Sequence, residues 1–176
     1  MDQLVIAARA GDRRAFAELY RRFVRAVHGV ILARVPYREA ADLTQDTFAT
    51  ALERLPQLVE PAAFPGWLLA IARNRATDAL RTARPMAATG EMIDVPVAAS
   101  RAAEVAQVLA ALRGLPEAYQ ETLVLRLVEG LTGPEIAEQT GLAPGSVRVN
   151  LHRGMKLLRE RLGIAAGAEK EDSDVG

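Results

Sequence analysis

The sequence predicts an all-α fold: two small helical domains joined by a flexible linker, the second a four-helix domain that ends in a helix-turn-helix. Apolar residues recur every three or four positions along most of the 176 residues, which is the period of an amphipathic helix, and neither half reads as a strand. Residues 85–100 lack this period, contain two prolines and carry little charge, which indicates a linker. Within residues 132–162, a capping-box pattern, a turn glycine and a basic helix predict the helix-turn-helix.

Composition narrows the possible classes of protein. The chain has no cysteine, and its two histidines, His28 and His152, lie far apart in the sequence, so we expect no disulfide and no bound metal. No stretch approaches the roughly 18 apolar residues of a membrane span, and no early segment resembles a secretion leader. We therefore expect no membrane span and a cytoplasmic location. Without a Ser-His-acid set or a glycine-rich phosphate loop, the sequence predicts neither an enzyme nor a cofactor.

The first domain, residues 1–84, is predicted to begin with two helices. A short helix over residues 3–10 gives way at Gly11, and Asp12 is placed to cap a longer helix over residues 13–34. The apolar residues of the longer helix follow the helical period closely, which predicts a side that faces a core.

The third helix, residues 38–55, carries two stripes of side chains. One stripe is apolar and predicts a buried side. The other is acidic and free of bulky groups; it comprises Asp42, Gln45, Asp46, Ala49 and Glu53. Two interpretations remain open from the residues alone, namely a solvated helix face and a docking surface for a basic partner.

A loop over residues 56–65, stiffened by three prolines, is expected to present Phe64, and Trp67 is expected to open a helix that runs to residue 84. Trp67 either packs in the core or offers a stacking platform. The same helix carries a polar face, which could be only solvated; its residues are Asn74, Thr77, Asp78 and Arg81, flanked by Arg73 and Arg75.

The second domain, residues 101–163, is predicted to contain two core helices followed by the helix-turn-helix. Thr132 and Glu135 have the spacing of a capping box, and Gly141 supplies the turn. The last helix, residues 144–162, has an apolar stripe and an outer face with five cations against one acid. Such a face suits DNA phosphates and guanine edges in a major groove, although an ordinary solvated face is the alternative.

Net charge is zero because 22 cationic residues match 22 acidic ones. The acids are concentrated beyond the basic helix, where residues 164–176 combine small side chains with four acids and one lysine. This composition predicts a disordered acidic tail.

Four stretches of the chain, in this order and spacing, resemble the extracytoplasmic-function (ECF) sigma factors, the small two-domain branch of the bacterial RNA polymerase sigma family. The stretches are GDRRAFAELYRRF, ADLTQDTFATAL, FPGWLLAIARNRATDALR and residues 115–162. Together they cover nearly everything except the linker and the acidic tail. Two residues depart from the pattern: Ala143 stands where a capping Ser or Asp is expected, and Gly154 replaces a commoner alanine at a helix cost of up to about 1 kcal/mol.

The resemblance implies an alternative sigma factor that binds core RNA polymerase through its β′ clamp helices and β flap, directs promoter recognition and transcription initiation, and is held by an anti-sigma factor. It assigns polymerase binding to Asp42, Gln45, Asp46 and, from the core, Phe48. It assigns contacts with the −10 element to Phe64, Trp67, Arg73, Asn74, Asp78 and Arg81. It assigns contacts with the −35 element to Ser146, Arg148, Val149, His152, Arg153 and Lys156.

The main alternative is a stand-alone helix-turn-helix regulator that binds operator DNA as a dimer and never contacts polymerase. It explains residues 132–162. It leaves the acidic stripe and the tryptophan helix of the first domain without a function.

Overall fold

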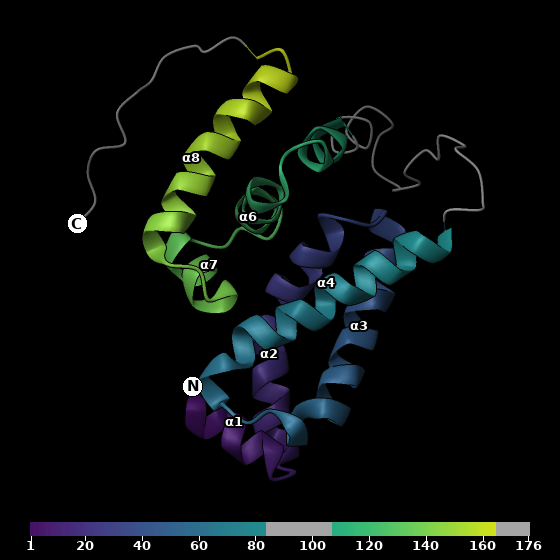
Figure 1. The fold of residues 1–176 in the computed structure, drawn as a ribbon, viewed down its shortest axis with the longest axis vertical. Helices are drawn as coiled ribbons and strands as arrows, with labels where there is room; N and C mark the ends of the chain where they lie inside the picture. Colours follow the sequence, from purple (N-terminus) through teal and green to yellow (C-terminus); the bar gives the residue numbers. More distant parts are fainter. Residues whose placement is uncertain (84–106, 165–176) are drawn as a thin grey trace.

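The computed structural model describes residues 1–83 and 107–164, and within these ranges it contains helices and turns but no strand. Figure 1 shows two groups of helices, which we call the first half (residues 1–83) and the second half (residues 107–164). The all-α prediction is confirmed for these residues. The predicted linker, the start of the helix expected from residue 101 and the acidic tail from residue 165 lie outside the described residues.

The first half contains α1 (Asp2–Arg9), α2 (Arg13–Leu32), α3 (Tyr37–Arg54) and α4 (Phe64–Ala83). Asp12 caps α2 as predicted, because its Oδ1 accepts hydrogen bonds from the backbone N–H groups of Arg14 at 2.8 Å and Ala15 at 3.2 Å. Two single turns of 3₁₀ helix, Leu55–Gln57 and Pro61–Ala63, connect α3 to α4. In Figure 1, α4 crosses α2 and runs beside α3, which encloses the first core.

The second half contains a helical stretch over residues 107–113, then α6 (Glu117–Leu127), α7 (Gly133–Thr140) and α8 (Pro144–Arg161). The predicted capping box is present: the Glu135 carboxylate accepts from the Thr132 N–H at 2.7 Å, and Thr132 Oγ1 accepts from the Glu135 N–H at 3.4 Å. Gly141 ends α7 with a φ of 74°, a left-handed conformation that favours glycine. The turn between α7 and α8 is therefore that of a helix-turn-helix.

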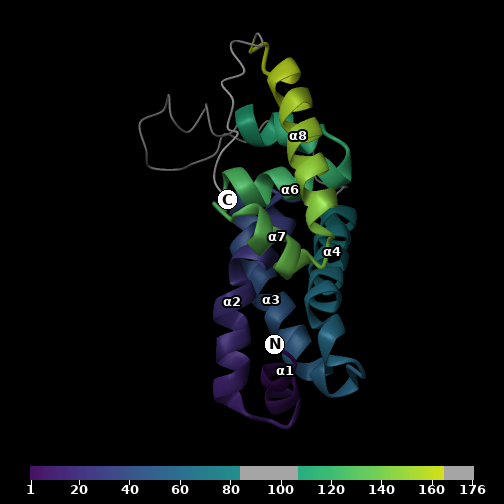
Figure 2. The ribbon, with the colours of Figure 1, turned by 90° about the vertical axis from the view of Figure 1, so that its left-hand side faces the viewer.

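The two halves pack against each other. α6 lies on α2, α7 lies on both α2 and α4, and the buried apolar side chains of both halves belong to one cluster (Figure 2). One close approach is at Gly29 of α2, where an added Cβ would lie 2.7 Å from Leu125 Cδ2 and 2.9 Å from Glu129 Cγ. Because any larger residue would meet α6 there, glycine sets the separation of the two helices.

α6 is buried on more sides than its periodicity predicts. The apolar residues Leu127 and Val128 are 45% and 44% exposed, whereas Gln120, Glu121 and Thr122 are buried. The reason is that α6 lies between α8 on one side and the first half on the other, so its polar residues fall in an interface that a single-helix pattern does not reveal. In the first half, Leu52 and Leu80 are also exposed.

Gly154 occupies a second close approach, between α8 and α6. An added Cβ would lie 3.0 Å from Tyr119 Cβ and 3.0 Å from Leu123 Cδ1. The lower helix propensity of glycine is thus offset by the tighter packing that it permits.

Replacing Gly154 with Leu should destabilise the chain by about 1–3 kcal/mol, because the side chain would be forced into a filled interface. Urea unfolding of the full chain measures this. Gly145→Leu is the matched control on the same helix, since no atom lies within 4 Å of its added Cβ. Equal unfolding midpoints for the two variants would contradict the close-packing explanation.

The capping box should make α7 sensitive to acid. The Thr132 hydroxyl and then the Thr132 backbone N–H lower the pKa of Glu135 from its ordinary value of 4.5. A carboxyl with a lowered folded-state pKa stabilises the fold above that ordinary value, and this contribution is lost as the pH falls through the folded-state pKa. Glu135→Gln should therefore be less stable than the parent chain at about pH 7, and the difference should narrow at about pH 3. Urea midpoints at both pH values test this, with the exposed Glu138→Gln of the same helix as control; a pH-independent difference would argue against the cap.

Candidate polymerase and nucleic-acid interfaces

The acidic stripe of α3 is a solvent-facing surface. Asp42, Gln45 and Asp46 are exposed, as are Ala49 and Glu53. Phe48 is buried, as predicted, with its ring centroid 4.5 Å from that of Tyr20 on α2. The stripe therefore presents carboxylates on the exposed side of a helix whose buried side packs on α2 through Phe48 and Tyr20.

The buried side of α3 carries three threonines: Thr44, Thr47 and Thr50. Each hydroxyl donates a hydrogen bond to the carbonyl four residues earlier, over 2.7 to 2.9 Å. Thr50 also accepts from Arg75 Nη2 of α4 at 2.6 Å, which ties the two helices together. Buried hydroxyls are thereby satisfied without side chains from the exposed stripe.

The polar face of α4 lies over a shallow pocket of about 410 Å³ between α3 and α4. Asn74, Asp78 and Arg81 are exposed and line it, and Arg81 Nη1 lies 3.4 Å from Asp78 Oδ1. The predicted grouping of these three side chains on one face is confirmed. Their polar atoms face solvent, where a ligand can reach them.

Phe64 is placed differently from the prediction. The loop was expected to present it, but the residue begins α4 and is fully buried, edge-on to Phe23 with ring centroids 5.3 Å apart. Its ring also lies 5.9 Å from that of Trp67, which is half-buried. Burial of an aromatic ring stabilises a fold more than exposure of that ring in a loop. Phe64 therefore packs in the core and anchors the start of α4.

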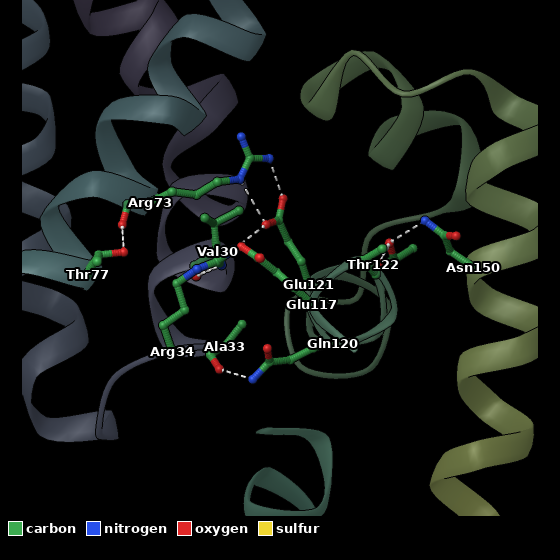
Figure 3. A network of polar contacts seen from close by, with 11 residues as sticks. Val30, Ala33, Arg34, Arg73, Thr77, Glu117, Gln120, Glu121, Thr122 and Asn150 are labelled. Carbon is green, nitrogen blue, oxygen red and sulfur yellow. Dashed lines mark hydrogen bonds and ion pairs between the residues drawn. The ribbon is translucent and has the colours of Figure 1, made fainter. Parts of the chain in front are cut away.

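Arg73 was grouped with the exposed face of α4, but its guanidinium is engaged with the second half. Arg73 Nη2 donates to Glu121 Oε1 at 2.7 Å, and Arg73 Nε donates to Glu121 Oε2 at 3.1 Å (Figure 3). This is a two-point contact between a planar guanidinium and a carboxylate. The hydrogen bonds to Glu121 raise the pKa of Arg73 against the opposing effect of burial, so the guanidinium stays protonated.

Glu121 receives a second arginine from the other side of the interface. Arg34, which follows α2, places Nη2 3.2 Å from Glu121 Oε2 and also contacts Glu117, one turn earlier on α6. The side chains of Arg34 and Glu121 are only 9% and 10% exposed, and that of Arg73 is 35% exposed. Two cations and two carboxylates from three elements thus form a network, which we call the Glu121 network; it is buried at Arg34 and Glu121 and reaches solvent at Glu117, whose side chain is 70% exposed.

Hydrogen bonds to backbone carbonyls flank the Glu121 network. Gln120 Nε2 donates to the carbonyl of Ala33, and Arg113 Nη2 donates to the carbonyl of Val35 at 2.7 Å. Burial lowers the pKa of Arg113. These contacts satisfy carbonyls in the segment that follows α2 with donors from the second half.

His28 contacts the second half, because its Nδ1 lies 2.6 Å from Glu129 Oε1. Neither this contact nor the Glu121 network was predicted. The only sequence signal was the presence of acids within an otherwise apolar stretch of the α6 region.

The outer face of α8 is exposed along its length. The residues expected to contact DNA all lie on it: Ser146, Arg148, Val149, His152, Arg153 and Lys156. The opposite side is buried through Val147, Gly154 and Leu158. Asn150 was expected outside but is half-buried, and its Nδ2 donates to Thr122 Oγ1 at 3.5 Å, which helps to hold α8 on α6 (Figure 3).

Residues 1–83 and 107–164 contain no group of three or more His, Cys, Asp or Glu side chains that could hold a metal ion. Within the same ranges, no helix is both long and apolar enough to cross a membrane.

Two family models match the chain. Sigma-70 region 2 matches residues 19–85, and Sigma-70, region 4 matches residues 106–158. The first match contains the acidic stripe and all of α4, and the second contains α7 and most of α8. The two matches therefore fall on the two halves.

The similarity to known relatives extends over most of the chain. It is 35% identical over 162 residues to the RNA polymerase sigma factor CarQ of Myxococcus xanthus, covering 88% of this chain and 93% of CarQ. It is 34% identical over 173 residues to the ECF RNA polymerase sigma factor BldN of Streptomyces coelicolor, covering 92% of this chain and 66% of BldN. Among solved structures, CnrH in complex with the cytosolic domain of CnrY superposes with a TM-score of 0.62 at 27% identity, covering 94% of this chain and 98% of CnrH.

Proposed function

Because this chain belongs to the extracytoplasmic-function RNA polymerase sigma factors, we propose that it binds core RNA polymerase and directs promoter recognition and transcription initiation. The observation that carries the proposal is the pairing, in one chain, of an exposed acidic face on α3 with an exposed basic face on α8. The first domain (residues 1–84) acts on polymerase and the −10 element, and the second (residues 101–163) acts on the −35 element. Residues 85–100 link them, and residues 164–176 form a tail.

Polymerase binding uses the acidic stripe of α3. Asp42, Gln45 and Asp46 present two carboxylates and an amide that suit a basic helical surface, here the β′ clamp helices. Phe48 contributes from the core by fixing the helix against Tyr20. The β flap is the second polymerase contact, made by the second domain.

The −10 element is contacted by α4. Asn74, Asp78 and Arg81 offer exposed donors and acceptors for unpaired bases and phosphates. Trp67, nearer the start of the same helix, is half-buried. Arg73 joins them once it leaves Glu121. Phe64 acts through the core rather than by touching a base, since the ring is fully buried.

The −35 element is read by α8 in the major groove. Arg148 and Arg153 suit bidentate contacts with guanine, and Ser146, Val149 and His152 lie near enough on the same face to meet bases or phosphates. Lys156 and Arg159 lie further along and meet phosphates.

An anti-sigma factor holds the chain inactive in the cytoplasm. Support comes from CnrH, whose structure was solved in complex with the cytosolic domain of CnrY. We propose no catalytic activity, cofactor or metal for this chain. The dimeric operator-binding regulator is not favoured, because the relatives cover both halves and not only the helix-turn-helix.

Replacing Asp42 and Asp46 together with Arg should abolish association with core polymerase, because like charges would then meet across the interface. Both residues are exposed, so the fold should remain intact. Co-purification with core polymerase measures the effect, and circular dichroism checks the fold. Glu18→Arg with Glu160→Arg is the control, since it changes the net charge equally elsewhere on the surface. Undiminished association of the first variant would refute the assignment.

Replacing Arg148 or Arg153 with Ala should cost about 1–3 kcal/mol on the cognate −35 sequence and relax the preference at one base position. Arg159→Ala should instead weaken all sequences alike and reduce the salt dependence by about one unit. Binding of holoenzyme to a panel of single-base promoter variants at two salt concentrations separates these effects. If Arg148→Ala and Arg153→Ala lowered the affinity equally for every promoter variant, these residues would not read bases, and α8 would contribute only electrostatic attraction.

A further inference from the structure

We propose that Arg34 and Arg73 form a masked phosphate-binding site, which Glu121 occupies while the two halves are packed and which a backbone phosphate of the promoter strand occupies after they separate. The inference rests on the proposed function of α4. It adds Arg34 to the DNA-binding surface and makes the packed arrangement incompatible with full contact to the −10 strand.

The geometry is that of a formed anion site. Two guanidinium groups, from α4 and from the residue after α2, converge on one carboxylate, with Arg73 making both of its hydrogen bonds at 2.7 and 3.1 Å. Arg34 is positioned independently of Glu121, because its Nη1 also donates to the carbonyl of Val30 at 2.9 Å. The site therefore does not depend on α6 to hold Arg34 in place.

Carboxylate and phosphate are alternative partners for such a site. Both accept paired hydrogen bonds from a planar guanidinium, so they compete for the same donors. If α6 moved away, the two guanidinium groups would face solvent, and the donors that now bind carboxylates would be free for another anion. A phosphate from a strand that follows the neighbouring exposed face of α4 can take these donors.

Promoter geometry requires the halves to separate. The −10 and −35 elements are centred about 25 base pairs apart, or about 85 Å at roughly 3.4 Å per base pair. A compact chain of this length has a radius of gyration of about 15 Å, which corresponds to a diameter of about 40 Å. The packed arrangement, in which α7 lies on α2 and α4, cannot place α4 and α8 on both elements at once.

The packed state must therefore reduce the apparent affinity for DNA, because only the open fraction offers both arginines. Loss of charge-assisted hydrogen bonds at Glu121 should shift the packed-to-open equilibrium about tenfold toward the open state. The apparent affinity for single-stranded DNA should rise by up to the same factor.

The first test measures binding of the full chain to a fluorescein-labelled single-stranded 20-mer of mixed sequence by anisotropy. Glu121→Gln should bind about tenfold more tightly than the parent chain. Glu138→Gln is the matched control: it removes the same charge from another contact between the halves, Glu138 with Arg22 at 3.9 Å, where both side chains are exposed. Arg73→Ala added to Glu121→Gln should remove the increase in DNA affinity. Arg34→Ala added to Glu121→Gln should reduce that increase.

The second test measures the separation of the halves without any DNA or polymerase. Because the chain lacks cysteine, Ala17→Cys and Glu160→Cys create the only two labelling sites for spin-label distance measurements. Glu121→Arg should lengthen and broaden the distance distribution, and Arg73→Glu added to it should restore the short distance. Gly29→Leu should open the halves by steric clash with Leu125 while Glu121 is intact, and it should also increase DNA binding.

Equal DNA affinity for the parent chain, Glu121→Gln and Glu138→Gln would overturn the proposal, and so would equal distances for the parent chain and Glu121→Arg. Opening without a gain in DNA affinity would overturn it too, because the site would then not take a phosphate. Failure of the proposed function would be seen separately: the unmodified chain would then not co-purify with core polymerase.

Discussion

The carboxylate of Glu121 is the group on which the arrangement of the two halves depends. A buried carboxylate is costly unless cations compensate it, and here the compensation comes from Arg34 and Arg73, both in the other half. The apolar contacts around it, such as Leu125 against Gly29, are non-directional. The ion pairs therefore specify the orientation of α6, and the apolar burial supplies most of the attraction.

The same interface links the two functional surfaces that lie outside it. Neither the acidic stripe of α3 nor the outer face of α8 takes part in the packing, so both remain accessible while the halves are together. The polar face of α4 is divided: Asn74, Asp78 and Arg81 are free to contact ligand from solvent, whereas Arg73 faces α6. In the proposed function, docking on polymerase and reading of duplex DNA are thus separable from single-strand binding.

Helix boundaries could be predicted from sequence because their signals are local. Asp12 caps α2, and the Thr132 and Glu135 pair caps α7, through hydrogen bonds that span three residues or fewer. The buried positions of α6 and the role of Arg73 could not be predicted, because their partners lie far along the chain: Glu121 is 48 residues from Arg73 and 87 from Arg34. Phe64 was misplaced for the same reason, since its contact with Phe23 is a property of the assembled core.

The three threonines on the hidden side of α3 have a consequence for the opposite side. A threonine hydroxyl that bonds the carbonyl one turn earlier tends to bend a helix, and Thr44, Thr47 and Thr50 do this in succession along one face. Any bend that these bonds introduce in α3 changes the directions in which Asp42 and Asp46 project, although the three threonines lie on its buried side. Two chains with identical acidic stripes could present differently shaped docking surfaces if their buried threonines differed.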